Sequence, residues 1–175
     1  MKRALVWLPL GAFALLFAVV ASGLVKPADR TVHSAMIDKP LPTFSLPAAV
    51  PGKPGLGSAM FHQGQPRLLN IFASWCIPCI AEAPQLMRLR AAGVPIDAIA
   101  IRDTAPALQD FLRRNGDPYE RIGSDRDSSV QLALGSSGVP ESFVIDGQGR
   151  IVLQHVGDIR PEEVADIVAA VRNAR

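Results

Sequence analysis

The chain has 175 residues, of which 49% are hydrophobic and 19% are charged, and its formal net charge at pH 7 is +2. This composition excludes a disordered chain, and so small a net charge argues against nucleic acid as the main partner. The length suits one domain with a real core plus an accessory segment, while only 2 cysteines exclude a disulfide-rich scaffold and a four-cysteine zinc site.

The first predicted element is an N-terminal segment, residues 4–25, which carries no charge and follows Lys2 and Arg3. A run of this length suits a helix across a bilayer core of about 30 Å. We therefore expect residues 1–25 to be a retained membrane anchor that exports everything after it. A cleavable signal sequence, cut near Ala21-Ser22-Gly23, is the alternative.

The next segments are irregular. Residues 26–42 are polar with scattered prolines and read as a tether, so the folded domain is expected over residues 43–175. A short edge strand is predicted over residues 43–47. Residues 48–65 are rich in Gly and Pro and predict a loop or an irregular hairpin.

From residue 67 onward the hydrophobic pattern alternates between short apolar runs and helical spacing. It predicts strands over residues 68–73 and 94–101, with helices over residues 76–91 and from Asp103 or Thr104 to about Asn115. A short helix is expected over residues 128–134. Because strands alternate with helices here, the expected fold class is α/β.

The C-terminal part of the chain predicts a hairpin and a final helix. Strands over residues 142–146 and 150–156 are joined by Asp146-Gly147-Gln148-Gly149. The helix has Pro161 in its first turn and basic residues at its end, and its apolar stripe consists of Val164, Ile167, Val168 and Val171. The whole order predicts a central mixed sheet flanked by helices.

Both cysteines occur in one motif, Trp75-Cys76-Ile77-Pro78-Cys79, where a predicted strand meets a predicted helix. A c-type haem site is excluded because it needs His directly after the second Cys, and Ile80 stands there. Half of a zinc site and an inert structural disulfide are the less favoured alternatives, since no second Cys pair exists and the closed loop is very short. The favoured interpretation is a redox-active dithiol.

Helix geometry supports that interpretation. Two cysteines three residues apart lie on one face of a helix, one turn apart. The first sits at the helix N-terminus, where free N–H groups and the dipole favour the thiolate that attacks disulfides. We therefore expect Cys76 to be the exposed nucleophile and Cys79 to resolve the mixed disulfide. Pro78 stiffens the turn between them.

The chain resembles the thioredoxin-like superfamily, and within it the membrane-anchored cytochrome c biogenesis proteins called CcmG or DsbE. The resemblance covers about residues 36–175 and rests on residues 68–76, Cys79-Ile80-Ala81-Glu82, residues 138–146 and His155-Val156-Gly157. The CxxC motif, Gly138-Val139-Pro140-Glu141 and the N-terminal anchor together make the match strong. The sequence departs from the family at Ile80, where a charged residue is common.

The resemblance implies roles for residues around the dithiol. It implies that Asn70, Glu82 and Glu141 tune the active site, although Glu82 is otherwise read as a solvated helix residue and Asn70 as one satisfied by backbone. It places a cis Pro140 against Cys76, with Trp75, Pro78 and Val139 on the substrate-binding surface. An ordinary X–Pro bond would be trans.

The resemblance also implies the function. The chain is expected to be a thiol:disulfide oxidoreductase of the bacterial inner membrane, with a single span and its catalytic domain in the periplasm. It would reduce apocytochrome c, or haem-lyase components that hold it, and be recharged by a membrane thiol–disulfide reductant of the DsbD or CcdA type. No metal or organic cofactor is implied. A disulfide-forming oxidant and a non-redox apocytochrome-binding protein are the alternatives.

Overall fold

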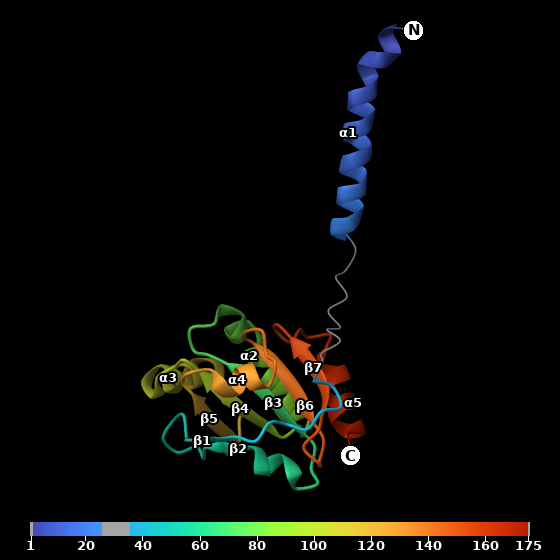
Figure 1. Ribbon diagram of the computed structural model, residues 1–175. Helices are drawn as coiled ribbons and strands as arrows, with labels where there is room; N and C mark the ends of the chain where they lie inside the picture. Colours follow the sequence, from blue (N-terminus) through green and yellow to red (C-terminus); the bar gives the residue numbers. More distant parts are fainter. Residues whose placement is uncertain (1, 26–35, 175) are drawn as a thin grey trace. The chain divides into compact units, whose positions relative to one another are not determined.

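Figure 1 shows the computed structural model of the chain, which describes residues 2–25 and 36–174. The chain divides into an N-terminal unit that contains α1 and a second unit that contains every later element. Helix α1 (Lys2–Val25) has 24 residues and includes Pro9. Within the described residues, no helix has the combination of length and apolar character that crossing a membrane requires.

The second unit is built on a five-stranded mixed sheet in the order β5-β4-β3-β6-β7. Strand β3 pairs in parallel with β4 and antiparallel with β6, while β4–β5 is parallel and β6–β7 is antiparallel. This confirms the predicted mixed sheet. The strands are β3 (Arg67–Phe72), β4 (Ile96–Ile101), β5 (Arg121–Asp125), β6 (Glu141–Ile145) and β7 (Ile151–Val156).

The central strands form the core because both of their faces are covered. Every residue of β3, β4 and β6 is buried, which explains their nearly continuous apolar runs. Strand β5 is the one that the sequence analysis did not predict. Its sequence, Arg-Ile-Gly-Ser-Asp, has too few apolar residues to show a strand pattern, and it is recruited at the edge of the sheet by pairing with β4.

The second unit also contains the four α-helices α2 to α5, which occur along the chain in the predicted order. Helices α2 and α5 pack against each other, and α5 also packs on β6. Helix α5 begins at Val164, later than expected, because residues 161–163 form a turn in which Arg160 N–H donates to the Glu163 carboxylate. The helices are α2 (Ile77–Ala91), α3 (Ala105–Asn115), α4 (Ser129–Ala133) and α5 (Val164–Asn173).

The segment before β3 binds both edges of the sheet. At β7, Asp38 N–H donates to Ile151 O (2.8 Å), and Ile151 N–H donates to Lys39 O (3.0 Å). These contacts place residues 38–41 in the folded domain, ahead of the expected boundary at residue 43. Residues 26–35 of the predicted tether lie outside the described residues.

Further along, the same segment reaches β5. It forms a small hairpin of β1 (Ser45–Leu46) and β2 (Leu56–Gly57), followed by the 3₁₀ helix η1 (Ser58–His62). Backbone groups of residues 47–54 then pair with β5, for example Ala49 N–H with Ile122 O at 2.9 Å. The hairpin lies so close to β5 that a Cβ on Gly123 would be 2.8 Å from the Leu46 Cβ. The predicted irregular hairpin therefore covers the β5 edge.

Candidate active site

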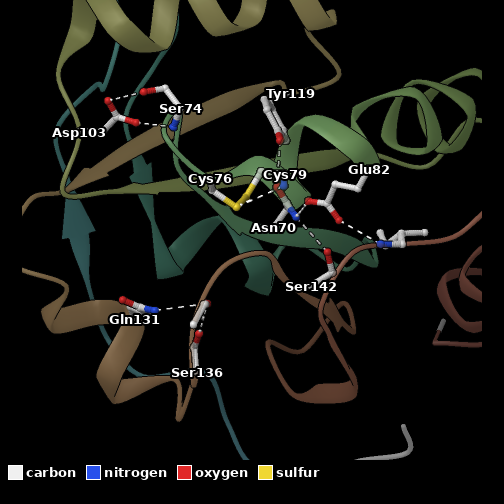
Figure 2. The surroundings of a disulfide bond; sticks show 12 residues. Asn70, Ser74, Cys76, Cys79, Glu82, Asp103, Tyr119, Gln131, Ser136 and Ser142 are labelled. Carbon is white, nitrogen blue, oxygen red and sulfur yellow. Dashed lines mark hydrogen bonds between the residues drawn. A yellow bond between two sulfur atoms is a disulfide. The ribbon is translucent and has the colours of Figure 1, made fainter. Parts of the chain in front are cut away.

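The two cysteines form a disulfide where β3 leads into α2, shown in Figure 2. The sulfurs are 2.08 Å apart and the Cα atoms 5.3 Å apart. Cys76 is the N-cap of α2, and its Sγ accepts a hydrogen bond from Cys79 N–H at 3.2 Å. Pro78 follows in the first turn, where its missing N–H breaks no helical bond. The sulfur of Cys76 therefore faces the positive end of the α2 dipole.

The expectation that Cys76 is exposed was wrong for this disulfide form. The Cys76 residue is 4% exposed and Cys79 is 1% exposed, so both are buried and the difference between them is small. The reason is that Cys76 Sγ is bonded to Cys79 and turned toward the first turn of α2. Exposure belongs instead to the neighbouring side chains: Trp75 is 57%, Ile77 79% and Ile80 44% exposed.

The loop that carries Trp75 and Cys76 is held by the loop after β4. The carboxylate of Asp103 accepts hydrogen bonds from Ser74 N–H at 2.6 Å and from the Ser74 hydroxyl at 2.9 Å. It also accepts from the N–H of Thr104, the residue that precedes the first turn of α3, at 2.8 Å. The indole N–H of Trp75 donates to Arg102 O at 3.3 Å. These bonds fix the approach of the chain to the disulfide.

A buried polar network lies next to the cysteines, with Asn70 of β3 at its centre (Figure 2). The Asn70 amide nitrogen donates to Glu82 Oε1 and to Ser142 Oγ, both at 3.0 Å. Its oxygen accepts from the Tyr119 hydroxyl at 2.8 Å. The partners of Asn70 are thus side chains rather than backbone. Glu82 is only 1% exposed, so the alternative of a solvated helix residue was wrong.

Glu82 is the titratable member of this network. Burial raises the pKa of Glu82 from 4.5 to about 7, and the nearby charge of Asp158 adds to the rise. Hydrogen bonds from the Asn70 amide and from Ile159 N–H, the latter at 3.2 Å, oppose it. Glu82 lies three residues after Cys79 in α2, hence on the same face of the helix. A carboxyl group with such a pKa can exchange a proton near neutral pH.

The third predicted tuning residue, Glu141, belongs to a different cluster. Glu141 is opposite Ile71 in the β3–β6 register, while Ser142 is opposite Asn70. Since side chains alternate along a strand, Glu141 and Ser142 point to opposite faces of the sheet. The Glu141 carboxylate accepts from the Ser136 hydroxyl at 2.7 Å, from Ser137 N–H at 2.9 Å and from the Gln154 amide.

Glu141 therefore holds the loop that precedes Pro140. In that loop, the Gly138 carbonyl accepts from Ser136 Oγ at 3.1 Å and from Gln131 Nε2 at 3.3 Å. The peptide bond between Val139 and Pro140 is cis, as the resemblance implied. Pro140 and Glu141 are both buried at the start of β6, beside the strand that leads to Cys76.

The sequence analysis missed two groups of residues at the site. These are Tyr119 and Ser142, which hold Asn70, and Ser74, which binds Asp103 in the loop before the cysteines; Asp103 itself was expected either to rim the site or to cap a helix. The signal for Tyr119 was weak because it directly precedes the unpredicted strand β5. In the part of the chain that the structure describes, His, Cys, Asp and Glu side chains form no group of three or more that could hold a metal ion.

A disulfide at the N-terminus of a helix that follows a central strand of a mixed sheet defines the class: a thioredoxin-like thiol–disulfide oxidoreductase. The Redoxin family model matches residues 36–171. The chain is 38% identical to the thiol:disulfide interchange protein DsbE of Pasteurella multocida, over 87% of this chain and 86% of that protein. It is 35% identical to DsbE of Escherichia coli K12, over 92% and 89% of the two chains.

A solved structure gives the same result. The thiol:disulfide interchange protein of the thioredoxin family from Chlorobium tepidum has a TM-score of 0.63 and 26% identity, covering 82% of this chain and 99% of that one. The fold is therefore thioredoxin-like. The chain belongs to the DsbE family of thiol:disulfide interchange proteins.

Proposed function

We propose that this chain is a membrane-attached, periplasmic reductant that acts in cytochrome c maturation. Its dithiol would reduce a disulfide of apocytochrome c, or of a haem-lyase component that holds apocytochrome c. A membrane thiol–disulfide reductant of the DsbD or CcdA type would restore the dithiol. The observation that carries the proposal is the Cys76–Cys79 disulfide at the N-terminus of α2, with the buried carboxyl of Glu82 one turn further along that helix.

The proposed reaction has two exchange steps. The Cys76 thiolate attacks one sulfur of the substrate disulfide, which forms a mixed disulfide and releases the other substrate sulfur as a thiolate. The Cys79 thiolate then attacks Cys76 Sγ, which releases the second substrate thiol and forms the Cys76–Cys79 disulfide. Two electrons pass from the dithiol to the substrate. The disulfide form described above is the product of this reaction.

Glu82 has a proposed role in the second step. Cys79 must lose its proton before it attacks, and in a buried site water is a poor acceptor. A carboxylate three residues further along the same helix, with a pKa of about 7, is poised to take that proton. Asn70, which cannot titrate, holds the carboxylate through its amide nitrogen at 3.0 Å.

The surroundings of the disulfide support a polypeptide substrate. Trp75, Ile77 and Ile80 are exposed apolar side chains next to the buried cysteines. Such a surface favours contact with apolar residues that an unfolded chain exposes around its cysteines. Ile80 makes this surface apolar at a position where the family commonly has a charge.

Membrane attachment and the periplasmic location are proposed from the sequence. Residues 4–25 carry no charge, and Lys2 and Arg3 precede them on the side expected to stay in the cytoplasm. The mature protein should keep Met1 and fractionate with membranes. A soluble product beginning near Leu24 would show instead that the segment is a cleaved signal sequence.

The reduction potential tests the direction of electron flow. Equilibration of the full chain with glutathione should give a value nearer to thioredoxin, about −270 mV, than to the oxidant DsbA, about −120 mV. A value near the second would overturn the proposal in favour of a disulfide-forming oxidant.

Cysteine variants test the substrate. The variants are expressed in cells from which the gene for this protein has been deleted. There, Cys76→Ala should fail to restore cytochrome c assembly. Cys79→Ala should instead accumulate a mixed disulfide with apocytochrome c or a haem-lyase component, detectable by mass spectrometry. Full cytochrome c assembly with Cys76→Ala would favour a non-redox binding protein.

A further inference from the structure

Tyr119 is a buried residue that the mechanism above does not use. It lies just before β5, is 2% exposed, and its ring stacks on Phe72 of β3 with centroids 4.9 Å apart. The stacking places its hydroxyl 2.8 Å from the Asn70 side-chain oxygen, as Figure 2 shows. Burial raises the pKa of Tyr119 well above its ordinary value, so the hydroxyl stays protonated and donates a hydrogen bond to Asn70.

This donation decides which way the Asn70 amide points. An amide has an oxygen that only accepts and a nitrogen that only donates. With the oxygen bonded to Tyr119, the nitrogen faces Glu82 Oε1 and Ser142 Oγ, both at 3.0 Å. In the opposite orientation, the hydroxyl hydrogen of Tyr119 would face the amide nitrogen, which does not accept hydrogen bonds, and would lose its acceptor.

The orientation matters because both oxygens of Glu82 then face donors. Oε1 faces the Asn70 nitrogen and Oε2 faces Ile159 N–H. A carboxylate accepts both bonds, whereas a protonated carboxyl group must direct its own hydrogen elsewhere. We propose that Tyr119 is a positioning residue, which holds the Asn70 amide nitrogen against Glu82 and so keeps this carboxyl group ready to accept a proton. This inference rests on the proposed role of Glu82.

The groups that act on Glu82 are few. Asp158, in the loop after β7, favours the protonated form by charge repulsion, and Asn70 and Ile159 N–H favour the carboxylate. Tyr119 is neutral and contributes through Asn70 rather than by its own charge. Of these, only the Asn70 contact is reversible by turning an amide. If the amide turned, its oxygen would accept a hydrogen bond from protonated Glu82 and stabilise the wrong form.

The test is Tyr119→Phe, which removes the hydroxyl and keeps the ring stacked on Phe72. The carboxyl carbon of Glu82 is followed by NMR in the oxidised full chain as pH is varied, with Glu82→Gln to assign the signal. Loss of one buried hydrogen bond and turning of the amide should lower the acid dissociation constant of Glu82 roughly tenfold, so its titration moves to higher pH. The pH profile of mixed-disulfide resolution by Cys79 should move in the same direction.

Two controls separate positioning from a general loss of packing. Ser142→Ala removes the contact of the Asn70 nitrogen with Ser142 Oγ but leaves Tyr119 to orient the amide, so the Glu82 titration should shift less than in Tyr119→Phe. In an Asn70→Ala background, Tyr119→Phe should cause no further shift, because Tyr119 acts through Asn70. An unchanged Glu82 titration in Tyr119→Phe, or an equal shift in the Asn70→Ala background, would overturn the inference.

The proposed function fails in a different way. If Glu82→Gln leaves the pH profile of resolution unchanged while Tyr119→Phe still shifts the Glu82 titration, then Tyr119 positions Asn70 as inferred and Glu82 is not the proton acceptor of Cys79.

Discussion

Two buried carboxylates of this domain have very different partners. Asp97 of β4 is fully buried and pairs with Arg67 of β3 at 2.5 Å. A second guanidinium, that of Arg121, lies 3.5 Å from the other Asp97 oxygen. Glu82 is 1% exposed, and its oxygens accept hydrogen bonds from the neutral Asn70 amide and from Ile159 N–H.

The difference shows how one fold keeps both an ion-paired acid and a titratable acid in its core. A buried charge with a matched counterion is neutralised in place, and removing one partner is what costs stability. Glu82 has no counterion among the described residues, so burial raises its pKa to about 7 and it titrates in the working range. Of the two acids, only Glu82 lies in α2, the helix that begins at the cysteine pair.

The largest effect should follow from breaking the structural pair. Asp97→Ala leaves the Arg67 guanidinium, whose side chain is 6% exposed, without its buried partner. We expect the free energy of unfolding to fall by about 3–5 kcal/mol, measured with urea at pH 7. The rate of thiol–disulfide exchange by the folded variant should stay close to that of the wild type. A loss below about 1 kcal/mol would show that Glu120, which also pairs with Arg67, carries the interaction.

The titratable acid, Glu82, should instead make stability depend on pH. Because the pKa of Glu82 is raised in the folded state from 4.5 to about 7, folding binds a proton between these values. Its contribution is fully present below about pH 4.5 and is lost as pH rises through 7, a change of about 3 kcal/mol. The difference in unfolding free energy between wild type and Glu82→Gln, measured from pH 4 to pH 8, should show this slope. A flat difference would contradict the raised pKa.

A smaller effect is expected at the loop before the cysteines. Asp103→Ala removes the acceptor of three hydrogen bonds, two from Ser74 and one from Thr104. We expect a loss of about 1–2 kcal/mol, faster hydrogen exchange at the Ser74 amide and slower attack by Cys76. Ser74→Ala keeps the backbone bond and should cause about half of the loss. Equal losses in the two variants would assign the effect to the Ser74 hydroxyl alone.

The smallest effect is expected for an ion pair that is exposed to solvent. Asp110 pairs with Arg113 and Arg114 on the surface of α3, and these arginine side chains are 74% and 70% exposed. Asp110→Ala should change the unfolding free energy by no more than about 0.5 kcal/mol. A loss as large as that of Asp97→Ala would mean that burial does not distinguish the two ion pairs.

Sequence patterns predicted the parts of the fold that depend on apolar runs. The buried strands β3, β4 and β6 and the helices α2 and α3 lie close to their expected positions, because both faces of those strands and one face of each helix are covered. Strand β5 was not predicted because its burial comes from pairing with β4 and from the hairpin packed on it. Both contacts depend on segments far away in the chain. The start of α5 was misplaced because a turn uses Pro161 in place of a first helical turn.

The site was predicted in a similar way. The cysteine spacing indicated the disulfide, and the resemblance pointed to Asn70 and Glu82. No local pattern reveals that Asn70 contacts Tyr119, since the two residues meet only when β3 and the chain entering β5 fold together. The separation of Glu141 from Glu82 also depends on the register of β3 and β6, which the sequence does not display.

The segment of residues 38–54 also protects the domain against edge-to-edge association. It hydrogen-bonds to the first residues of β7 at one side of the sheet and to β5 at the other. Open strand edges are templates on which an extended polypeptide can add itself as a further strand and start aggregation. By occupying these stretches of edge with its own backbone, the domain leaves less open edge on which another extended chain could add as a strand.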